Sequence, residues 1–364
     1  MQENQKFRMI LNMTIDARIR TFIELGTFLR DFSKGNSKGK LHEEFGADLS
    51  ELVERIHIQN PWFTEDNVRN SLSAIGDSLR EEPFVEWISL YISALSDKPA
   101  KTIAVIMAGN VPMVGFHDML CVLLSGNKFL GKLSSEDKIL LPFIAKIIIH
   151  IEPRFAELIL FMDGPLKNMD AVIATGSNNS ARYFDHYFGK YPHIIRRNRN
   201  SVAVLSGSEG RDELTALGND VFQYFGLGCR NVSKLFVPKG YNFDQFYEAI
   251  FDQKEIVNNN KYANNYDYNK TVYLMSNDQS LLDNNFLLLK HDNSYSSPIG
   301  VLFYEYYNSI SELNHKLAQD QELIQCIVSN DPGVNNAIPL GTAQCPGLSD
   351  YADGVDTMQF ITRL

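Results

Sequence analysis

Hydrophobic and polar residues alternate at helical spacing through the first part of the chain. Between residues 15 and 32 the apolar side chains share one helical face, namely Ile15, Ile19, Phe22, Ile23 and Phe28. Further on, Thr64 precedes two acidic residues, which is typical of a helix N-terminus. We therefore predict a helical N-terminal region over residues 1–95, packed on the domain that follows.

After residue 95 the pattern changes to short apolar runs separated by helical segments. The runs predicted as strands are 102–108, 127–132, 156–161, 170–175 and 201–206, and the helices cover 112–125, 138–150 and 179–188. Strands that alternate with helices indicate a parallel sheet covered on both faces, with ligands bound at the carboxyl ends of the strands. Residues 96–207 are thus predicted to form one α/β domain.

A second alternation begins near residue 208. It predicts helices over 211–225 and 242–252 and strands over 233–238, 271–276 and 299–307. The Asn-rich stretch 257–270 is interpreted as a polar surface loop. Residues 208–345 are therefore predicted as a second α/β domain, followed by a C-terminal segment, 346–364, whose residues 357–364 are predicted as an edge strand that could serve oligomerisation.

Composition narrows the function classes. The chain has 364 residues, which is enough for two domains, and a formal net charge of -10. Such a charge argues against a protein that coats nucleic acid or an anionic membrane surface, because it repels phosphate on average, but it leaves room for a local basic pocket for an anionic cofactor. The most apolar run, 139–151, contains Pro142, Lys146 and His150 and is too short and polar to span a bilayer, so no integral membrane segment is expected.

The four cysteines, Cys121, Cys229, Cys326 and Cys345, lie far apart and form no CxxC pair. Neither a metal site nor a disulfide framework is therefore expected. The N-terminus lacks the long apolar core of a signal peptide, so we expect a cytoplasmic protein whose thiols stay reduced.

Candidate chemistry gathers around two turns. There is no GxGxxG or GxxxxGK[ST] sequence, which gives a standard Rossmann or P-loop interpretation little support. The first predicted strand ends before Gly109 and Asn110, and the second ends in Lys132, beside the expected ligand crevice. Taken alone, Asn110 could be an ordinary turn residue and Lys132 a solvated charge.

The other turn holds Cys229, just after Gly226 and Gly228 in the stretch FGLGCRNVSKLFVP. Glycines allow a substrate to approach closely, and a thiolate is a good nucleophile for a thioester carbonyl. The alternative is a small buried residue. Cys121 and Cys326 lie in apolar segments and are interpreted as core residues, which leaves Cys345, in the loop TAQCPG, as the competing thiol.

Several motifs together resemble a known family. They are IAVIMAGNVPMVGFHDMLCVLLSGNKFLGKLSSED (103–137), AVIATGSNNSARYF (171–184), NRNSVAVLSG (198–207), FGLGCRNVSKLFV (225–237) and SYSSPIGVLFYEYYNSISELNHKL (294–317). In this order they are similar to the aldehyde dehydrogenase superfamily. NPWFT near residue 60, RNRNSVAVL and the ending GTAQCPGLSDYADGVDTMQFI bring the closest resemblance to the acyl-CoA reductases of the LuxC type, over residues 60–364.

The resemblance implies roles for individual residues. Cys229 matches the nucleophile of the superfamily, and Asn110 matches the amide that, together with the Cys229 N–H, donates to the developing oxyanion. Lys132 matches the lysine at the adenosine ribose of a nicotinamide cofactor. Thr175, Gly176 and Ser177 match a turn at a helix N-terminus near that cofactor, a position that an ordinary helix cap would also explain.

Two departures from the family pattern set the expected direction of the chemistry. The stretch IIRRNRNS (194–201) replaces the glutamate that activates a hydrolytic water, and the glutamate usually found at the nicotinamide ribose falls near Ser294. After Lys132, Ser134 and Ser135 stand in the cofactor motif, with Ser135 in place of its acidic residue. This favours NADPH, although Glu136 beside it leaves NADH open.

The resemblance therefore implies an α/β fold of the aldehyde dehydrogenase type, with two Rossmann-like parallel-sheet domains, for cofactor and cysteine, after the helical region. The expected reaction is the NADPH-dependent reduction of a long-chain fatty acyl thioester, carried by CoA or acyl carrier protein, through an acyl-cysteine. The relatives imply a homo-oligomer, a dimer or tetramer. Alternatives are an oxidative or phosphorylating aldehyde dehydrogenase and a non-catalytic scaffold. His117 is interpreted as a packing or helix-surface residue and Arg230 as a surface charge, and both Asp353 and Asp356 are expected to lie in a turn with a capping role.

Overall fold

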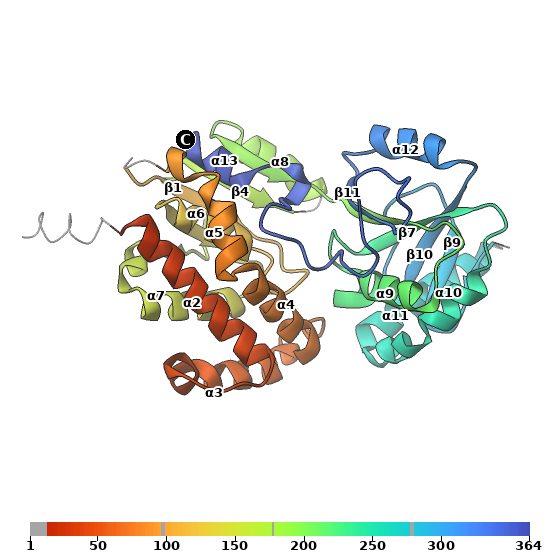
Figure 1. Ribbon diagram of the computed structural model, residues 1–364, viewed down its shortest axis with the longest axis horizontal. Helices are drawn as coiled ribbons and strands as arrows, with labels where there is room; N and C mark the ends of the chain where they lie inside the picture. The colour runs from red at the N-terminus through yellow and green to blue at the C-terminus, as the bar shows by residue number, and fades with distance from the viewer. Residues whose placement is uncertain (1–12, 96–98, 177, 277–279) are drawn as a thin grey trace, which may run out of the picture. The chain divides into compact units, whose positions relative to one another are not determined.

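The structure, a computed structural model, describes residues 13–95, 99–176, 178–276 and 280–364. The chain divides into two compact units (Figure 1). The first unit comprises residues up to Arg197 together with Gly347–Leu364, and the second comprises Asn198–Pro346. The division between the units therefore falls between Arg197 and Asn198, earlier than the predicted boundary after residue 207.

The first unit begins with helices, as the apolar spacing predicts. They are α2 (Ile15–Ser33), α3 (Lys40–Arg55), α4 (Glu65–Ser78) and α5 (Glu81–Ser89), with single 3₁₀ turns at Ile56–Ile58 and Ile92–Ala94. Thr64 is the N-cap of α4, because its hydroxyl accepts the amide of Asn67 at 3.3 Å. Buried side chains of these helices join the same hydrophobic core as one face of the first sheet.

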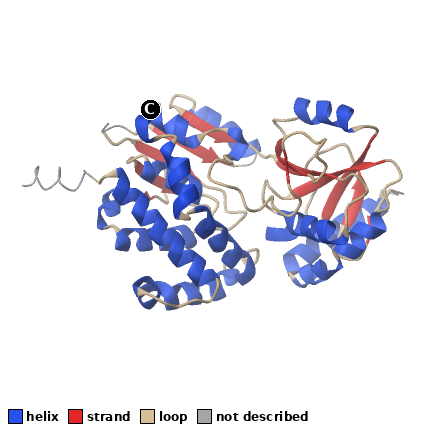
Figure 2. Cartoon of the chain, in the orientation of Figure 1, coloured by secondary structure: helices blue, strands red, loops and turns tan. Residues whose placement is uncertain are grey.

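The first sheet is wholly parallel and has the strand order β3-β2-β1-β4-β5. Its strands are β1 (Thr102–Ile106), β2 (Lys128–Lys132), β3 (Ile159–Phe161), β4 (Ala171–Thr175) and β5 (His193–Arg196). The connecting helices are α6 (Phe116–Leu124), α7 (Leu140–Ile151) and α8 (Asn178–Phe188), with a 3₁₀ helix at Pro153–Glu157. Ile103 and Val105 face the N-terminal helices, whereas Ala104 faces the core beneath α8, so both faces are covered (Figure 2).

The second unit contains a larger sheet, in the order β12-β11-β6-β7-β10-β9-β8, which is parallel except for the pair β8–β9. Its strands are β6 (Asn200–Val204), β7 (Val232–Pro238), β8 (Leu282–Asp283), β9 (Leu288–His291), β10 (Val301–Tyr307), β11 (Ile324–Val328) and β12 (Ala337–Ile338). Helices α9 (Arg211–Phe222) and α10 (Phe243–Ala249) cover one face, and α12 (Ile310–Gln319) covers the other (Figure 1). Two 3₁₀ helices, Gln223–Gly226 and Phe251–Asn258, follow α9 and α10.

The predicted first domain, 96–207, wrongly includes the run 201–206. Its strand, β6, pairs with β7 and β11 in the second sheet. The apolar pattern predicts the strand correctly, but it carries no information about which sheet the strand joins.

The Asn-rich stretch is also not the predicted loop. It forms most of α11 (Asn260–Met275), which also takes up residues 271–275 of the predicted strand 271–276. The side chain of Asn259 caps this helix by accepting the amides of Lys261 and Tyr262, and Tyr262 and Tyr266 are buried. Capping and the burial of aromatic rings therefore outweigh the low helix propensity of asparagine.

The predicted C-terminal strand is wrong as well, because residues 357–362 form helix α13 (Thr357–Thr362). Asp356 caps it through a 2.7 Å bond from the amide of Gln359, as expected of a capping residue. Met358 and Ile361 are buried in the core of the first unit, and α13 packs against α6. In the described part of the chain, no helix is long and apolar enough to cross a membrane.

Candidate active site

The predicted cofactor residues lie at one edge of the first sheet. The chain passes from β1 to β2 on one side and later to β4 on the other, so the connections change direction beside β1. Ile106, at the end of β1, is level with Lys132 on β2 and Ala174 on β4. The loop with Asn110, the end of β2 and the turn after Thr175 therefore share the carboxyl edge, at the point where α/β sheets bind ligands.

The loop between β1 and α6, which presents Asn110, is held from several sides. The hydroxyl of Ser71 on α4 donates to the carbonyl of Pro112 at 3.0 Å, and the amide of Met113 donates to Asp137 at 3.3 Å. Met113 has a φ of 62°, a left-handed conformation that a non-glycine residue adopts only when its surroundings impose it. Asn110 itself is an exposed residue of this loop.

Asp137 is the buried anchor of this loop. Burial raises the pKa of its carboxyl group, although amide hydrogen bonds from Met113, Leu140 and Ile139 oppose that rise. Position 109 requires glycine, because a Cβ there would lie only 2.6 Å from the Ser134 hydroxyl. The Asn110 turn thus lies directly against the segment that follows Lys132.

The groups around Lys132 suit a nucleotide. The Lys132 ammonium donates to the Gly164 carbonyl at 3.4 Å and is only partly covered. Ser134 accepts the amide of Glu136, while the exposed Ser135 hydroxyl lies 3.5 Å from the Glu136 carboxylate. A cation and hydroxyls at a strand end fit phosphate and ribose groups, whereas the Glu136 carboxylate repels an additional phosphate.

The turn after β4 is partly described. Thr175 ends the strand, and its hydroxyl accepts a 3.5 Å bond from the Arg196 guanidinium. A Cβ at Gly176 would come within 2.9 Å of the Ser180 and Phe184 side chains, so glycine permits α8 to start close to the strand. Ser177, the third predicted residue of this turn, lies outside the described residues.

In the second unit, Cys229 is exposed on a turn between the end of α9 and β7. The residues that lead into this turn are left-handed in succession, with φ values of 53° at Tyr224, 58° at Phe225 and 75° at Gly226. Each non-glycine residue in this conformation costs roughly 1–2 kcal/mol, so the surroundings must hold the turn in place. Tyr224 and Phe225 are both buried, which supplies part of that restraint.

Asn231 is the central support of the Cys229 turn, and the sequence interpretation gave it no role. Its side chain is buried, its carbonyl oxygen accepts the Gly228 amide at 2.8 Å, and its amide group donates to the Gln223 carbonyl at 2.7 Å. It also donates to the carbonyls of Asp220 and Val221 at the end of α9. The one available signal was an asparagine where the incomplete glycine motif GLGCRN calls for glycine.

Further bonds fix the cysteine from both sides. The Ser201 hydroxyl on β6 donates to the Cys229 carbonyl at 3.0 Å, and Arg230 donates to the Ala343 carbonyl. Asp220 accepts the amides of Gly341 at 2.6 Å and Ala343 at 2.9 Å, which ties down the loop that carries Cys345. Burial raises the pKa of Asp220 to about 6 against the opposing effect of these bonds.

The other cysteines differ in exposure. Cys121 is fully buried, and burial raises the pKa of its thiol well above the ordinary value. Cys326 is half-buried with its sulfur 3.0 Å from the Ser201 hydroxyl, whereas Cys345 is exposed. The core interpretation thus fits Cys121 best, and Cys345 keeps its place as the competing thiol.

Asn110 and Cys229 belong to different units, each described by itself, so their joint role stays a prediction. Within its own unit, Ser294 is exposed, and its amide donates to Asp292 at 2.9 Å. Among the described residues, no group of three or more histidine, cysteine or acidic side chains is arranged to hold a metal ion.

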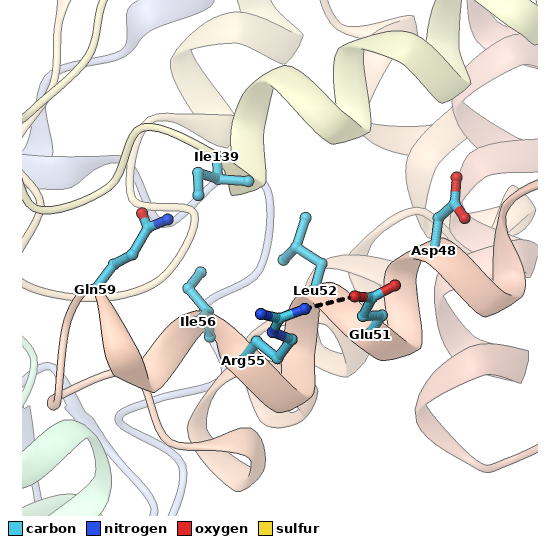
Figure 3. Close-up of a pocket in the computed structure, with 7 residues that line it drawn as sticks. All are labelled: Asp48, Glu51, Leu52, Arg55, Ile56, Gln59 and Ile139. Atoms are coloured by element: carbon cyan, nitrogen blue, oxygen red, sulfur yellow. Dashed lines mark hydrogen bonds and ion pairs between the residues drawn. The ribbon is translucent and has the colours of Figure 1, made fainter.

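Surface hollows lie away from the predicted residues. A groove of about 230 Å³ on the first unit is lined by Asp48, Glu51, Leu52, Arg55, Ile56, Gln59 and Ile139, with Arg55 and Glu51 paired at 2.8 Å (Figure 3). Another hollow, of about 580 Å³, is lined by Glu213, Ser329, Asn330, Asp331, Pro332, Val334, Ala337 and Pro339. Neither contains a residue of the candidate site.

The two sheets and their strand orders define the class of protein: the fold is that of the aldehyde dehydrogenases. Aldehyde dehydrogenase 21 from Physcomitrella patens, solved with the reaction product succinate, aligns at a TM-score of 0.66 and 13% identity over 98% of this chain and 85% of that chain. An NAD-dependent aldehyde dehydrogenase from Sinorhizobium meliloti aligns at 0.64 and 12% over 90% and 74%. An NADP-dependent enzyme from E. coli aligns at 0.56 and 13% over 83% and 73%.

The family comparison is more specific. The family model of acyl-CoA reductase (LuxC) matches residues 91–252, which confirms the predicted resemblance over that stretch. The match includes the β1 loop, the end of β2 and the Cys229 turn. No curated protein matches the chain.

Proposed function

We propose that the protein reduces an acyl thioester, most simply a long-chain fatty acyl-CoA, to the aldehyde through a covalent acyl group on Cys229. The observation that carries the proposal is the exposed thiol of Cys229 on a strained turn held by Asn231, inside the region that matches the acyl-CoA reductase family. Strained backbone that its surroundings hold in place is typical of functional sites.

In this proposal the Cys229 thiolate attacks the thioester carbonyl and forms a tetrahedral adduct. The Cys229 amide and the Asn110 side chain donate to the oxyanion, where negative charge develops. The bond to CoA then breaks, CoA leaves as its thiolate, and an acyl-enzyme thioester remains on Cys229. After reduction at this carbon, the hemithioacetal collapses, which releases the aldehyde and returns the Cys229 thiolate.

A nicotinamide cofactor supplies the hydride for that reduction when it is bound. Lys132, Ser134, Ser135, Thr175 and Gly176 would hold it at the carboxyl edge of the first sheet, with Ser177 beside them in the sequence. Lys132 beside Ser135 supports NADPH. The exposed Glu136 supports NADH, so competition between the two nucleotides in a binding titration decides this point.

Hydrolytic oxidation of aldehydes is disfavoured, because a water molecule would need a base at the acyl-enzyme. Residues 194–201, where the resemblance places that base, contain no carboxylate. Acyl carrier protein in place of CoA, a homo-oligomeric state and a cytoplasmic location remain part of the proposal. With the C-terminal residues folded as α13, the edge strand no longer supports oligomerisation.

The test is nucleotide consumption with a long-chain acyl-CoA by the wild type and by Cys229→Ala. We expect Cys229→Ala to lose activity by at least about a thousandfold, because the substitution removes the thiol that forms the proposed acyl-enzyme thioester. Cys345→Ala is the matched control and should keep activity within about twofold. Mass spectrometry after acyl-CoA is added without nucleotide should find the acyl group on Cys229.

An acyl group on Cys345, or full activity of Cys229→Ala, would contradict the assignment of the nucleophile. A folded wild type that consumes neither nucleotide with acyl thioesters of any chain length would favour the scaffold alternative.

A further inference from the structure

Arg230 follows Cys229 directly, and from the sequence it is interpreted as a surface charge. The two residues are the central pair of a tight turn, because the amide of Asn231 donates to the Gly228 carbonyl at 3.0 Å. The side chain of Asn231 closes the turn a second time by accepting the Gly228 amide at 2.8 Å. The cysteine and the arginine are therefore fixed side by side at the tip of a β-turn.

The guanidinium of Arg230 is anchored by a backbone carbonyl rather than by a carboxylate. Its Nε–H donates to the Ala343 carbonyl in the loop 341–345. In the part of the chain that the structure describes, its terminal Nη groups have no hydrogen-bond or ion-pair partner. Both oxygens of Asp220 instead accept backbone amides, from Gly341 at 2.6 Å and from Ala343 at 2.9 Å. Burial raises the pKa of Asp220 to about 6, and the charge of Arg230 opposes that rise, so the two charges interact across a short distance.

The other elements around the turn contribute mainly uncharged groups. The loop 341–345 has no charged side chain in its sequence. Arg199, before β6, donates to backbone carbonyls at the start of β11, which lies on the far side of β6 from β7. Tyr262 on α11 packs a neutral ring against the residues that lead into the turn. The end of α9 contributes Asp220, which makes this carboxylate and the adjacent guanidinium the charged pair at the turn.

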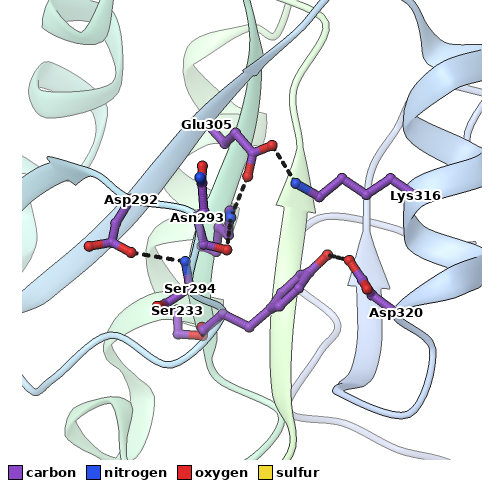
Figure 4. Close-up of polar contacts among 9 residues, drawn as sticks. Ser233, Asp292, Asn293, Ser294, Glu305, Lys316 and Asp320 are labelled. Carbon is purple, nitrogen blue, oxygen red and sulfur yellow. Dashed lines mark hydrogen bonds and ion pairs between the residues drawn. The ribbon is translucent and has the colours of Figure 1, made fainter.

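The buried lysine of β7 and the two histidines of this unit are engaged or placed elsewhere. Lys234 donates to Glu305 at 2.6 Å, and Glu305 also accepts from Lys316 on α12, so these charges compensate one another (Figure 4). His291 ends β9, two strands away from β7 in the sheet, and His315 lies on α12. Neither histidine lies on an element that holds the turn, which leaves the arginine beside the thiol as the group best placed to favour its ionisation.

We propose that Arg230 keeps Cys229 in its thiolate form, the form that attacks the thioester carbonyl. A cation beside a cysteine favours the ionised sulfur, and a guanidinium keeps its charge throughout the pH range in which a thiol titrates. The negative charge of Asp220 acts against the thiolate, so the two side chains change the ionisation of Cys229 in opposite directions. The inference rests on the proposed function and deepens it, but the ionisation of the thiol can be measured without any acyl substrate.

The test measures the rate at which iodoacetamide alkylates Cys229 in the native protein between about pH 5 and pH 10, by peptide mass spectrometry. The thiolate forms a bond to carbon and displaces iodide, so the rate follows the ionised fraction. Arg230→Met keeps the length and the apolar contacts of the side chain and removes its charge. We expect the midpoint of its rate profile to lie about one pH unit higher, which slows alkylation roughly tenfold at pH 7. Arg230→Lys should restore most of this change.

Asp220→Asn distinguishes an electrostatic role from a structural one. It removes the opposing negative charge, so we expect the midpoint of the rate profile to move to lower pH. A merely structural role of both side chains would loosen the same turn and move both variants in the same direction. Arg230→Gln, which keeps a donor for the Ala343 carbonyl, replaces Arg230→Met if circular dichroism shows that the latter does not fold.

Lys239→Met is the matched control. Lys239 is exposed and directly follows β7, so its replacement removes the same charge at the other end of that strand, roughly 20 Å from the turn. The rate profile of Cys229 should not change in this variant. The inference is overturned by a wild-type midpoint in the uncharged Arg230 variants, by a shift in the same direction in Asp220→Asn, or by an equal shift in Lys239→Met.

The same charge should appear in catalysis. With acyl-CoA and nucleotide, Arg230→Met should lose about tenfold in kcat/KM at pH 7 and approach the wild type above about pH 9, where the thiol ionises without help. A loss that stays constant over this pH range would contradict the role in ionisation. A wild type that shows the expected alkylation profiles but reduces no acyl thioester contradicts the proposed function and leaves the role of Arg230 standing.

Discussion

Cys121 and Cys229 show two opposite environments for a thiol. Cys121 lies on α6 with its sulfur 3.7 Å from His117 Nδ1, and Asp118 follows His117 in the sequence. A histidine and an acidic residue are the neighbours expected of a cysteine nucleophile. Yet Cys121 is fully buried, and burial raises the pKa of its thiol and lowers the pKa of His117. Cys229 is exposed on a turn formed by backbone and Asn231.

The two thiols thus differ in solvent access more than in the chemical type of their neighbours, and solvent access is one condition for a reactive thiol. The neighbours of Cys121 are already engaged: His117 donates to the Leu348 carbonyl at 3.0 Å, and Asp118 binds the Arg196 guanidinium with both oxygens. The Arg196 guanidinium also donates to the Thr357 hydroxyl in α13 at 3.0 Å. This region fastens the C-terminal segment to the first unit, whereas the Cys229 turn presents a group to solvent.

The largest expected effect comes from breaking that fastening. Asp118→Asn leaves the buried Arg196 guanidinium without its counter-charge, which should lower the free energy of unfolding by roughly 3–5 kcal/mol. Urea unfolding followed by circular dichroism measures it. Glu51→Gln, which breaks the exposed pair with Arg55, is the control and should cost less than about 1 kcal/mol. Equal losses in the two variants would show that the buried Asp118–Arg196 ion pair contributes no more to the free energy of unfolding than an exposed pair.

Asp220→Asn tests the support of the Cys229 turn. An amide group cannot accept both the Gly341 and Ala343 amides, so at pH 7 we expect a loss of roughly 1–3 kcal/mol in the free energy of unfolding. In the wild type, burial raises the pKa of Asp220 to about 6 in the folded state, above its ordinary value of 3.8, so the folded state binds more protons than the unfolded state between these pH values. The contribution of Asp220 to the free energy of unfolding therefore rises as the pH falls from 7 to 4.5.

Because Asp220→Asn lacks that proton, the gap between wild type and variant should widen from pH 7 to pH 4.5. Urea unfolding at both pH values measures the gap. A gap that narrows on acidification would show that Asp220 has a lowered pKa and is a simple anionic anchor.

In both units the sequence predicts some elements and misses others, for a physical reason. Buried parallel strands such as β1 and β4 are nearly continuous apolar runs, so their pattern alone predicts them. β5 is not predicted, because it is short and ends in Arg196. The burial of Arg196 depends on its ion pair with Asp118, 78 positions earlier in the chain. Helices α11 and α13 are not predicted, because their caps and buried side chains stabilise them although their composition does not favour a helix.

The same reasoning applies to the candidate site. Cys229, Asn110 and Lys132 stand in short motifs, so the sequence suggests them directly. Asp220 becomes significant only through Gly341, 121 positions away, and Ser201 only through Cys229, 28 positions away. Periodicity and motif spacing carry no information about such pairs, which depend on strand order.

The smallest expected effect concerns Cys121 itself and sharpens the comparison with Cys229. Cys121→Ala removes one buried sulfur atom and its contact with His117, which should lower the free energy of unfolding by about 1 kcal/mol. Reductase activity should stay within about twofold of the wild type, because the buried thiol cannot reach a substrate. In the native wild type, iodoacetamide should modify Cys229 and leave Cys121 unmodified until the protein is unfolded, as peptide mass spectrometry can show. Native alkylation of Cys121, or a loss of activity in Cys121→Ala comparable with that of Cys229→Ala, would mean that the buried histidine–cysteine pair takes part in the chemistry and that exposure does not separate the two thiols.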